Sequence, residues 1–271
     1  FLLVVFSSIS FYIQWHHKND IIVNSFIRKC IKLMNIKSWF PQVTFVHKQP
    51  ADFIIGHPHG ILSCGMIIHH FESDNTVFAV APILFHIPIF GWLARHMALI
   101  PASKHMIKKA LRENHKVILM VGGIEELLAH SQRKLYLQKR YGYVKIAKEL
   151  KKSLIPVYIE GEYDTFYNPS LPFLTFRQWL SKMLGFGIMF PWVFGWNGLW
   201  LPKRIPLSLH FGSPVQSDEC SLKELKHRYH RSLCQLMGSV YQETPQKIAN
   251  RHGLSLPILS PVLPLSKNGL D

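Results

Sequence analysis

The sequence predicts an α/β domain in which helices flank a largely buried sheet. Five short apolar runs, rich in β-branched residues, have the length and composition of strands. They are residues 52–56, 76–81, 116–121, 154–159 and 207–212. Because segments with helical periodicity lie between these runs, the alternation is typical of a layered α/β fold.

Four helices are predicted from the spacing of apolar residues. They cover residues 87–97, 103–113, 143–152 and 221–241. The last begins at Ser221 and carries Glu224 three residues later, a capping-box pattern that satisfies free amides at a helix start. No internal repeat is visible, so we expect one main domain.

The composition indicates a basic protein with part of its surface facing something apolar. Of the 271 residues, 48% are hydrophobic and only 17% are charged, against about a quarter in an average soluble domain. Lysine and arginine outnumber acidic residues by 31 to 16, giving a net charge of +15. This balance favours a membrane surface or a phosphate-bearing substrate. We expect no nucleic-acid partner, because RNP, zinc-finger and basic-zipper patterns are absent.

The four cysteines are isolated in the sequence. They are Cys30, Cys64, Cys220 and Cys234, with no CxxC pair and no regular spacing. This pattern argues against a disulfide scaffold or a structural zinc site and favours packed thiols in a reducing compartment.

The chain divides into four regions. The opening FLLVVFSSISFYI is uncharged and apolar but shorter than the roughly 20 residues of a spanning helix. We expect it to be the end of a membrane hairpin whose first part is missing, with Trp15 at the interface; a buried N-terminal helix is the alternative. The regions are a partial membrane segment at 1–20, a linker and amphipathic region at 21–50, the main domain at 51–250 and an irregular tail at 251–271.

The stretch at residues 171–202 differs from the rest of the main domain. It contains four tryptophans, five phenylalanines and four glycines with almost no acidic residue. Such a stretch is expected to face a membrane or an acyl chain. A glycine-rich insertion into the core is the alternative.

The tetrapeptide HPHG at residues 57–60 follows the first predicted strand. Metal-binding hydrolases with an HxH pair continue with an aspartate and a third histidine, whereas His59 is followed by Gly60 and apolar residues. A metal site is therefore not expected. A histidine displayed at the carboxyl end of a strand can serve as a general base near pH 7. On these four residues alone, an ordinary polar turn is the better explanation.

Two later strands also end in polar turns. The first leads into Gly122-Gly123, whose amides could bind a phosphate or an oxyanion, and then into Glu125-Glu126. The acidic pair has a simpler explanation at a helix start, where it suits the helix dipole. A basic cluster with Arg140 and Lys145 follows, and the next strand ends in IEGEYD.

The order of these motifs resembles the type 2 diacylglycerol O-acyltransferase family, which includes monoacylglycerol and wax-alcohol acyltransferases. The resemblance runs through HPHG, VGGIEE (121–126), RYGYVK (140–145) and LIPVYIEGE (154–162), and extends over roughly residues 50–245. HIPIFGWLARHMALIPAS and LWLPKRIPLSLHFGSPV are similar to further family segments. Two positions depart from the family pattern: Tyr141 stands in place of a lysine, and Glu160 in place of an apolar or aromatic residue.

The resemblance implies a glycerolipid-acyltransferase-like mixed sheet and acyl transfer from acyl-CoA to the hydroxyl of diacylglycerol. Monoacylglycerol and a long-chain alcohol are alternative acceptors, and a catalytically inactive homologue that binds membranes or lipid droplets is an alternative of another class. No cofactor is expected beyond acyl-CoA as co-substrate. The other expected partner is membrane lipid, in the endoplasmic reticulum membrane or at the lipid droplet surface.

The resemblance also implies roles for site residues. We assign the general base to His59, with His57 as its helper or alternative. Related glycerolipid acyltransferases carry HxxxxD, but Cys64 stands five residues after His59, so Glu126 is our candidate for orienting the imidazole. Backbone amides of Gly60, Gly122 or Gly123 are candidates for the oxyanion site. The substrate-binding candidates, for acyl-CoA phosphate or acceptor, are Arg140, Lys145 and Glu162.

Overall fold

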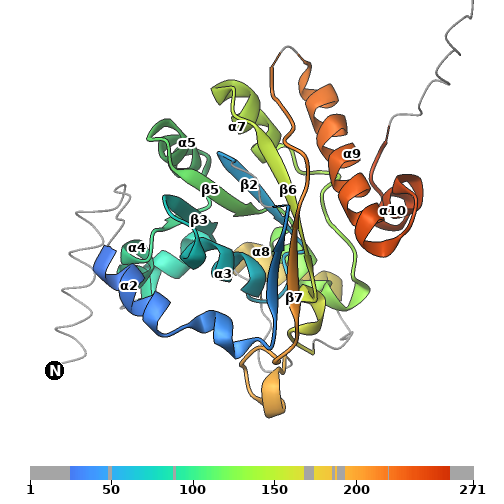
Figure 1. Ribbon diagram of the computed structural model, residues 1–271. Helices are drawn as coiled ribbons and strands as arrows, with labels where there is room; N and C mark the ends of the chain where they lie inside the picture. Colours follow the sequence, from blue (N-terminus) through green and yellow to red (C-terminus); the bar gives the residue numbers. More distant parts are fainter. Residues whose placement is uncertain are drawn as a thin grey trace, which may run out of the picture.

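The computed structural model describes most of the main domain (Figure 1). The described residues are 25–47, 51–87, 90–167, 174–184, 187, 193–218 and 220–256. The predicted membrane segment at residues 1–20 and most of the predicted tail lie outside them.

Within the described residues, seven strands form one mixed sheet in the order β1-β7-β6-β2-β5-β3-β4. Neighbouring strands run parallel except β6 and β7, which are antiparallel. The strands are β1 Val43–Val46, β2 Phe53–His57, β3 Thr76–Val80, β4 Leu99–Pro101, β5 Lys116–Met120, β6 Leu154–Glu160 and β7 Leu207–Phe211. The fold is therefore mixed α/β, and all five predicted strands are confirmed.

The burial of each strand follows from its place in the sheet. All five residues of the central strand β2 are buried, because helices cover both faces of the sheet there. In β7 buried residues alternate with part-exposed ones, which is the pattern of a strand buried mainly on one face. The continuous apolar run FIIG is thus the sequence signature of the strand that precedes HPHG.

Helices cover both faces of the sheet. They are α2 Ser25–Leu33, α3 Cys64–Glu72, α4 Phe90–His96, α5 Lys104–Arg112, α6 Gly123–Leu128, α7 Gly142–Leu150, α8 Leu174–Leu184, α9 Leu222–Tyr241 and α10 Pro245–His252. Short 3-10 helices span η1 Ile36–Trp39, η2 Pro82–His86, η3 His130–Gln132, η4 Glu162–Asp164 and η5 Trp196–Gly198. The four predicted helices are confirmed as α4, α5, α7 and α9.

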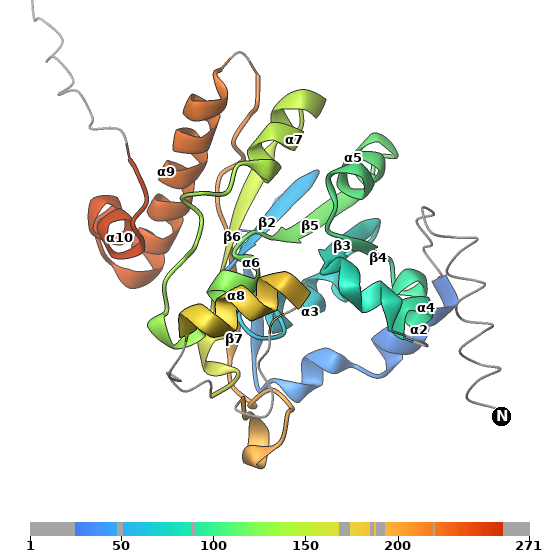
Figure 2. The same cartoon turned by 180° about the vertical axis from the view of Figure 1, so that it is seen from behind.

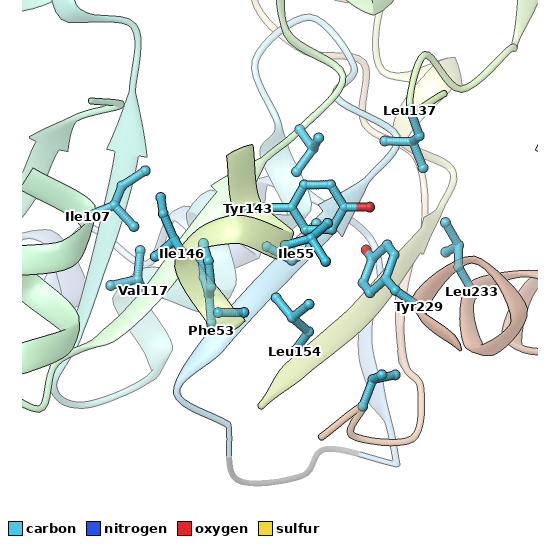
Figure 3. Close-up of a cluster of buried hydrophobic side chains, with 14 of the residues drawn as sticks. Phe53, Ile55, Ile107, Val117, Leu137, Tyr143, Ile146, Leu154, Tyr229 and Leu233 are labelled. Atoms are coloured by element: carbon cyan, nitrogen blue, oxygen red, sulfur yellow. The ribbon is translucent and has the colours of Figure 1, made fainter. Parts of the chain in front are cut away.

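Two apolar layers hold the helices to the sheet. On one face, α5, α7 and α9 lie side by side and pack on Phe53 and Ile55 of β2 (Figure 3). On the other face, Met66 of α3 packs against Ile54 and Ile118. Residues 54 and 55 point to opposite faces because side chains alternate along a strand, so β2 is anchored from both sides just before its carboxyl end.

The start of α9 has the predicted cap. The Ser221 hydroxyl accepts a hydrogen bond from the Glu224 amide at 3.1 Å. The Glu224 side chain does not close the second half of a capping box, since it pairs instead with Arg228 one turn along the helix. In the part of the chain that the structure describes, no helix is both long and apolar enough to cross a bilayer.

Candidate active site

The candidate site lies where three neighbouring strands end. β6, β2 and β5 run parallel, side by side, so their carboxyl ends meet at one edge of the sheet. β2 ends at His57, β5 leads into Gly122-Gly123, and β6 leads into Glu162. Open α/β sheets bind ligands at this edge, and the structure brings the three motifs together there.

His59 lies in the turn between β2 and α3 and is partly buried. Its ring Nδ1 lies 3.0 Å from the carbonyl oxygen of Gly60. Because a carbonyl oxygen only accepts hydrogen bonds, Nδ1 carries the proton, and the lone pair of the neutral ring is on Nε2. Burial lowers the pKa of His59, so the imidazole is neutral at pH 7. His59 therefore has the protonation state and tautomer of a general base.

Glu126 supports the backbone of this turn rather than the imidazole ring. Its carboxylate is 1% exposed, and Oε1 accepts a hydrogen bond from the His59 amide at 2.5 Å. Oε2 accepts from the Tyr136 amide at 3.0 Å. Burial raises the pKa of Glu126 to about 7. Our expectation that this residue orients the ring differs from the structure, in which the Gly60 carbonyl contacts the ring.

Glu162 closes the other end of the turn. It is fully buried, and its two oxygens accept hydrogen bonds from the amides of Cys64 and Gly65 at 2.8 and 2.9 Å. It therefore caps the first turn of α3, where a negative charge also suits the helix dipole. Burial raises its pKa to about 7. We expected Glu162 to bind substrate, but the structure gives both of its oxygens to the protein backbone.

The glycines beside the two glutamates make room for them. Gly60 has φ of +60°, and a Cβ there would lie 2.5 Å from Oε1 of Glu162. A Cβ on Gly122 would overlap the Glu126 carboxylate. Gly123 also has positive φ, at +61°, but its Cβ position is nearly open. Packing against the two glutamates therefore explains why glycine is needed at positions 60 and 122. This explanation is separate from their predicted role in an oxyanion site.

The basic candidates lie on the neighbouring segment. Arg140 pairs with Glu125 at 2.7 Å and approaches the Gly122 carbonyl at 3.5 Å, so its guanidinium lies against the glycine turn. Lys145 is exposed on α7. Arg140 is thus placed beside the site but already has a carboxylate partner, which a substrate phosphate would have to displace.

His57 differs sharply from His59. It is fully buried, and its Nε2 lies 2.7 Å from the Tyr229 hydroxyl. Burial, reinforced by nearby His230 and His252, lowers the pKa of His57 to about 3. An imidazole with so low a pKa is a weak proton acceptor, so His59 is the better base of the two.

The two departures from the family pattern have local explanations. The ring of Tyr141 lies under the ammonium of Lys226, with Nζ 3.5 Å from the ring centroid. Glu160, at the end of β6, pairs with His210 of the adjacent antiparallel strand at 3.2 Å. Cys64 is buried, and burial together with Glu162 raises the pKa of its thiol, which makes it a poor nucleophile.

Two residues near the site were missed in the sequence. Tyr229 occupies an apolar position of a helix 172 residues after His57. His130 follows the VGGIEE motif, is 3% exposed, and packs edge-on against Tyr163 with ring centroids 5.2 Å apart. Burial lowers the pKa of His130 to about 4. In the sequence, the position of His130 shortly after the VGGIEE motif could have indicated that it lies near the site. Tyr229 has no comparable signal.

The described part of the chain contains no cluster of side chains suited to bind a metal ion. Among those residues, no three His, Cys, Asp or Glu side chains come together in an arrangement that could hold a metal ion. The candidate site is built around His59, the two buried glutamates and the turns that they support.

Comparisons with known proteins place this site in context. The family model described as diacylglycerol acyltransferase matches residues 1–256. Diacylglycerol O-acyltransferase 1 of Eremothecium gossypii is 30% identical over 221 residues, covering 72% of this chain and 48% of that protein. Human 2-acylglycerol O-acyltransferase 3 is 26% identical over 274 residues, covering 88% of this chain and 79% of that protein.

Among solved structures, the 1-acyl-sn-glycerophosphate acyltransferase of Thermotoga maritima matches with a TM-score of 0.48 and 16% identity, covering 78% of each chain. The chain spans about half the length of the Eremothecium relative. Since the family model covers nearly the whole sequence, the chain belongs to the diacylglycerol acyltransferase family.

Proposed function

We propose that this protein transfers a fatty acyl group from acyl-CoA to the hydroxyl of diacylglycerol, forming triacylglycerol. Membership of the family supports this reaction class. The observation that carries the proposal is the neutral His59 with Nδ1 hydrogen-bonded to the Gly60 carbonyl. Because the matched relatives are named for both diacylglycerol and 2-acylglycerol, monoacylglycerol is the first alternative acceptor. A long-chain alcohol is the second alternative.

The proposed reaction is a direct transfer. Nε2 of His59 takes the proton of the acceptor hydroxyl as its oxygen attacks the thioester carbonyl carbon. The carbonyl oxygen becomes an oxyanion, for which backbone amides of Gly60, Gly122 or Gly123 are the proposed donors. When the C–S bond breaks, CoA leaves as a thiolate and takes the proton from His59. No acyl-enzyme forms, so the high-pKa thiol of Cys64 is not required.

Binding of acyl-CoA is proposed at the basic side of the site. The phosphates of CoA are attracted by the net charge of +15, with Arg140 and Lys145 as direct ligands. We do not propose Glu162 as a ligand here, because both of its oxygens accept hydrogen bonds from the backbone at the start of α3. No cofactor takes part in the proposed chemistry.

An acceptor panel tests the function. Membranes from cells that lack their own neutral-lipid synthesis, expressing this chain, should convert labelled acyl-CoA to triacylglycerol when diacylglycerol is added. Monoacylglycerol and a long-chain alcohol are assayed in parallel, so the product identifies the acceptor. Lack of transfer to all three acceptors, with the protein folded and on membranes or droplets, would identify a lipid-binding homologue without activity.

We also propose that the protein lies on membrane lipid through α8. Phe176, Trp179 and Met183 are exposed at one side of this helix, and the rings of the first two stack at 5.8 Å. Leu199, Trp200 and Leu201, which follow η5 in the chain, are also exposed. Such apolar residues favour the acyl boundary of a bilayer. Since α8 packs on α6, which carries Glu126, this surface is next to the site (Figure 2).

Basic residues follow the exposed 199–201 segment and favour anionic headgroups. Lys203 and the exposed Arg204 follow the 199–201 segment. We propose the endoplasmic reticulum membrane, and the lipid droplet surface, as the location. Residues 1–20 are proposed as a membrane segment in addition.

Introducing negative charge on α8 should weaken membrane binding. The double variant Phe176→Asp/Trp179→Asp is expected to lower affinity for vesicles of phosphatidylcholine and phosphatidylserine by at least about tenfold, because each aromatic side chain loses a burial free energy of roughly 1.5–3 kcal/mol. Sedimentation with vesicles measures this. Gln235→Asp, at an exposed position of α9, adds the same kind of charge as a control. Equal binding of wild type and double variant would reject α8 as the docking surface.

A further inference from the structure

Tyr229 of α9, the longest helix among the described residues, contacts His57, the first histidine of HPHG. Its hydroxyl lies 2.7 Å from Nε2 of His57, and both side chains are completely buried. The neighbouring Tyr143 packs edge-on against Tyr229, with ring centroids 5.0 Å apart (Figure 3). The rotamer of His57 is therefore held by a contact from the sheet-facing side of α9.

The direction of this hydrogen bond follows from the other polar atoms. Nδ1 of His57 and the Tyr143 hydroxyl have no hydrogen-bond partner among the described residues. If Nε2 carried the proton, the Tyr229 O–H would lack an acceptor and Nδ1 would be a second unmatched atom. If Tyr229 donates to Nε2, only the Nδ1–H remains unmatched. Because each unmatched buried polar group costs free energy, Tyr229 donates and Nδ1 carries the proton.

Both histidines then carry the proton on Nδ1, but the ring nitrogen without a hydrogen-bond partner differs between them. In His59, Nδ1–H donates to the Gly60 carbonyl, and the bare Nε2 can take a proton. In His57, Nε2 accepts from Tyr229, and the unmatched atom is the donor Nδ1–H. A base and a neutral hydrogen-bond donor thus stand two residues apart at the same strand end. Acyl transfer needs both, because a proton leaves the hydroxyl as negative charge develops on the carbonyl oxygen.

We propose that His57 is the side-chain donor to the oxyanion, and that Tyr229 is the positioning residue that fixes its Nδ1–H tautomer. This assignment rests on the proposed acyl transfer. In this assignment His57 is no longer a second base. Its side chain is a further hydrogen-bond donor to the oxyanion, in addition to the backbone amides.

Paired hydroxyl deletions test the role of Tyr229. Tyr229→Phe is expected to lower kcat about tenfold with little change in KM, because one hydrogen bond that fixes the donor is lost. Tyr143→Phe removes a buried hydroxyl without a partner in the described residues and should keep kcat within about twofold. Thermal unfolding of both variants checks that they are folded. Equal kcat in the two variants would overturn the proposal.

Amide replacements test which nitrogen of His57 acts. The amide of asparagine reaches the position of Nδ1, whereas the amide of glutamine reaches that of Nε2. His57→Asn should therefore retain about tenfold more kcat than His57→Gln, and adding Tyr229→Phe to His57→Asn should cause no further loss. Equal activity of the two amide variants, or a further tenfold loss in the double variant, contradicts the proposal.

A readout without catalysis separates this inference from the proposed function. Imidazole ¹⁵N NMR of histidine-labelled protein, with His57→Asn to assign the signal, should show a protonated Nδ1 and a bare Nε2 that change in Tyr229→Phe. Wild-type protein without transfer to any acceptor would reject the proposed function while this tautomer test still stands. A protonated Nε2 on His57 in active wild type would reject the inference alone.

Discussion

Replacing His59 by alanine should reduce acyl transfer by a factor of about 10² to 10⁴ in kcat, the range contributed by a positioned general base. The physical reason is the loss of the nitrogen that we propose takes the acceptor hydroxyl proton. Burial lowers the pKa of this imidazole, which favours the neutral ring that the proposed base role requires. Labelled acyl-CoA and diacylglycerol in membranes provide the measurement.

The same substitution should leave the fold intact. The His59 ring makes a hydrogen bond to the adjacent Gly60 carbonyl, whereas the turn is held by the backbone of His59. Its amide donates to Glu126, and its carbonyl accepts from the Ser63 hydroxyl at 2.7 Å. Alanine keeps both contacts, so thermal unfolding should change little.

A second histidine variant serves as control. His105 is exposed on α5, and His105→Ala should keep full activity and stability. Retention of wild-type kcat by His59→Ala would remove this residue from the mechanism. Loss of activity together with a collapsed unfolding transition would instead assign His59 a structural role.

The sheet was predictable from sequence wherever a strand is long and buried. β2, β5 and β6 have at least five residues each and leave continuous apolar runs. β1 and β4 were missed because they have only four and three residues, too few to establish a period. α3 was missed because Gly65 and two histidines interrupt its apolar pattern, while its cap comes from Glu162, 98 residues away from Cys64.

The site was predictable as a location but not as a set of contacts. Since parallel strands end at one edge, motifs that follow neighbouring strands had to meet, and the motif order indicated a base at His59. Which atoms a glutamate contacts depends on tertiary packing. Glu126 reaches the backbone of a residue 67 positions earlier, and Tyr229 reaches His57 across 172 positions. Neither separation leaves a local pattern.

Replacing Glu126 by glutamine should both destabilise the protein and lower its activity. Each carboxylate oxygen accepts a backbone N–H, from His59 and from Tyr136. At pH 5 the acid is protonated, but both of its oxygens still carry lone pairs that can accept these N–H groups. Glutamine puts an NH₂ group in place of one oxygen, so two donors face each other in a buried site. The expected loss in the free energy of unfolding at pH 5 is about 2–3 kcal/mol. Acyl transfer falls with it, because the His59 backbone loses its support.

The adjacent glutamate provides the matched control. Glu125 is partly exposed and pairs with Arg140 on the protein surface, so Glu125→Gln should cost less than about 1 kcal/mol in the free energy of unfolding. Urea unfolding of both variants measures the difference. Equal destabilisation would mean that the buried contacts of Glu126 contribute no more than a surface ion pair.

The pH dependence of this difference reports the charge of Glu126. Burial raises its pKa from 4.5 to about 7 in the folded protein, so the folded state holds the proton more tightly than the unfolded state. The contribution of Glu126 to the free energy of unfolding is therefore full below about pH 4.5 and falls by about 3 kcal/mol as the pH rises through 7. Glutamine does not titrate, and Glu162 is common to both proteins. The stability advantage of wild type over Glu126→Gln should thus shrink between pH 5 and pH 8, whereas an advantage that grows with pH would mean that Glu126 is ionised more readily in the folded protein than in the unfolded chain.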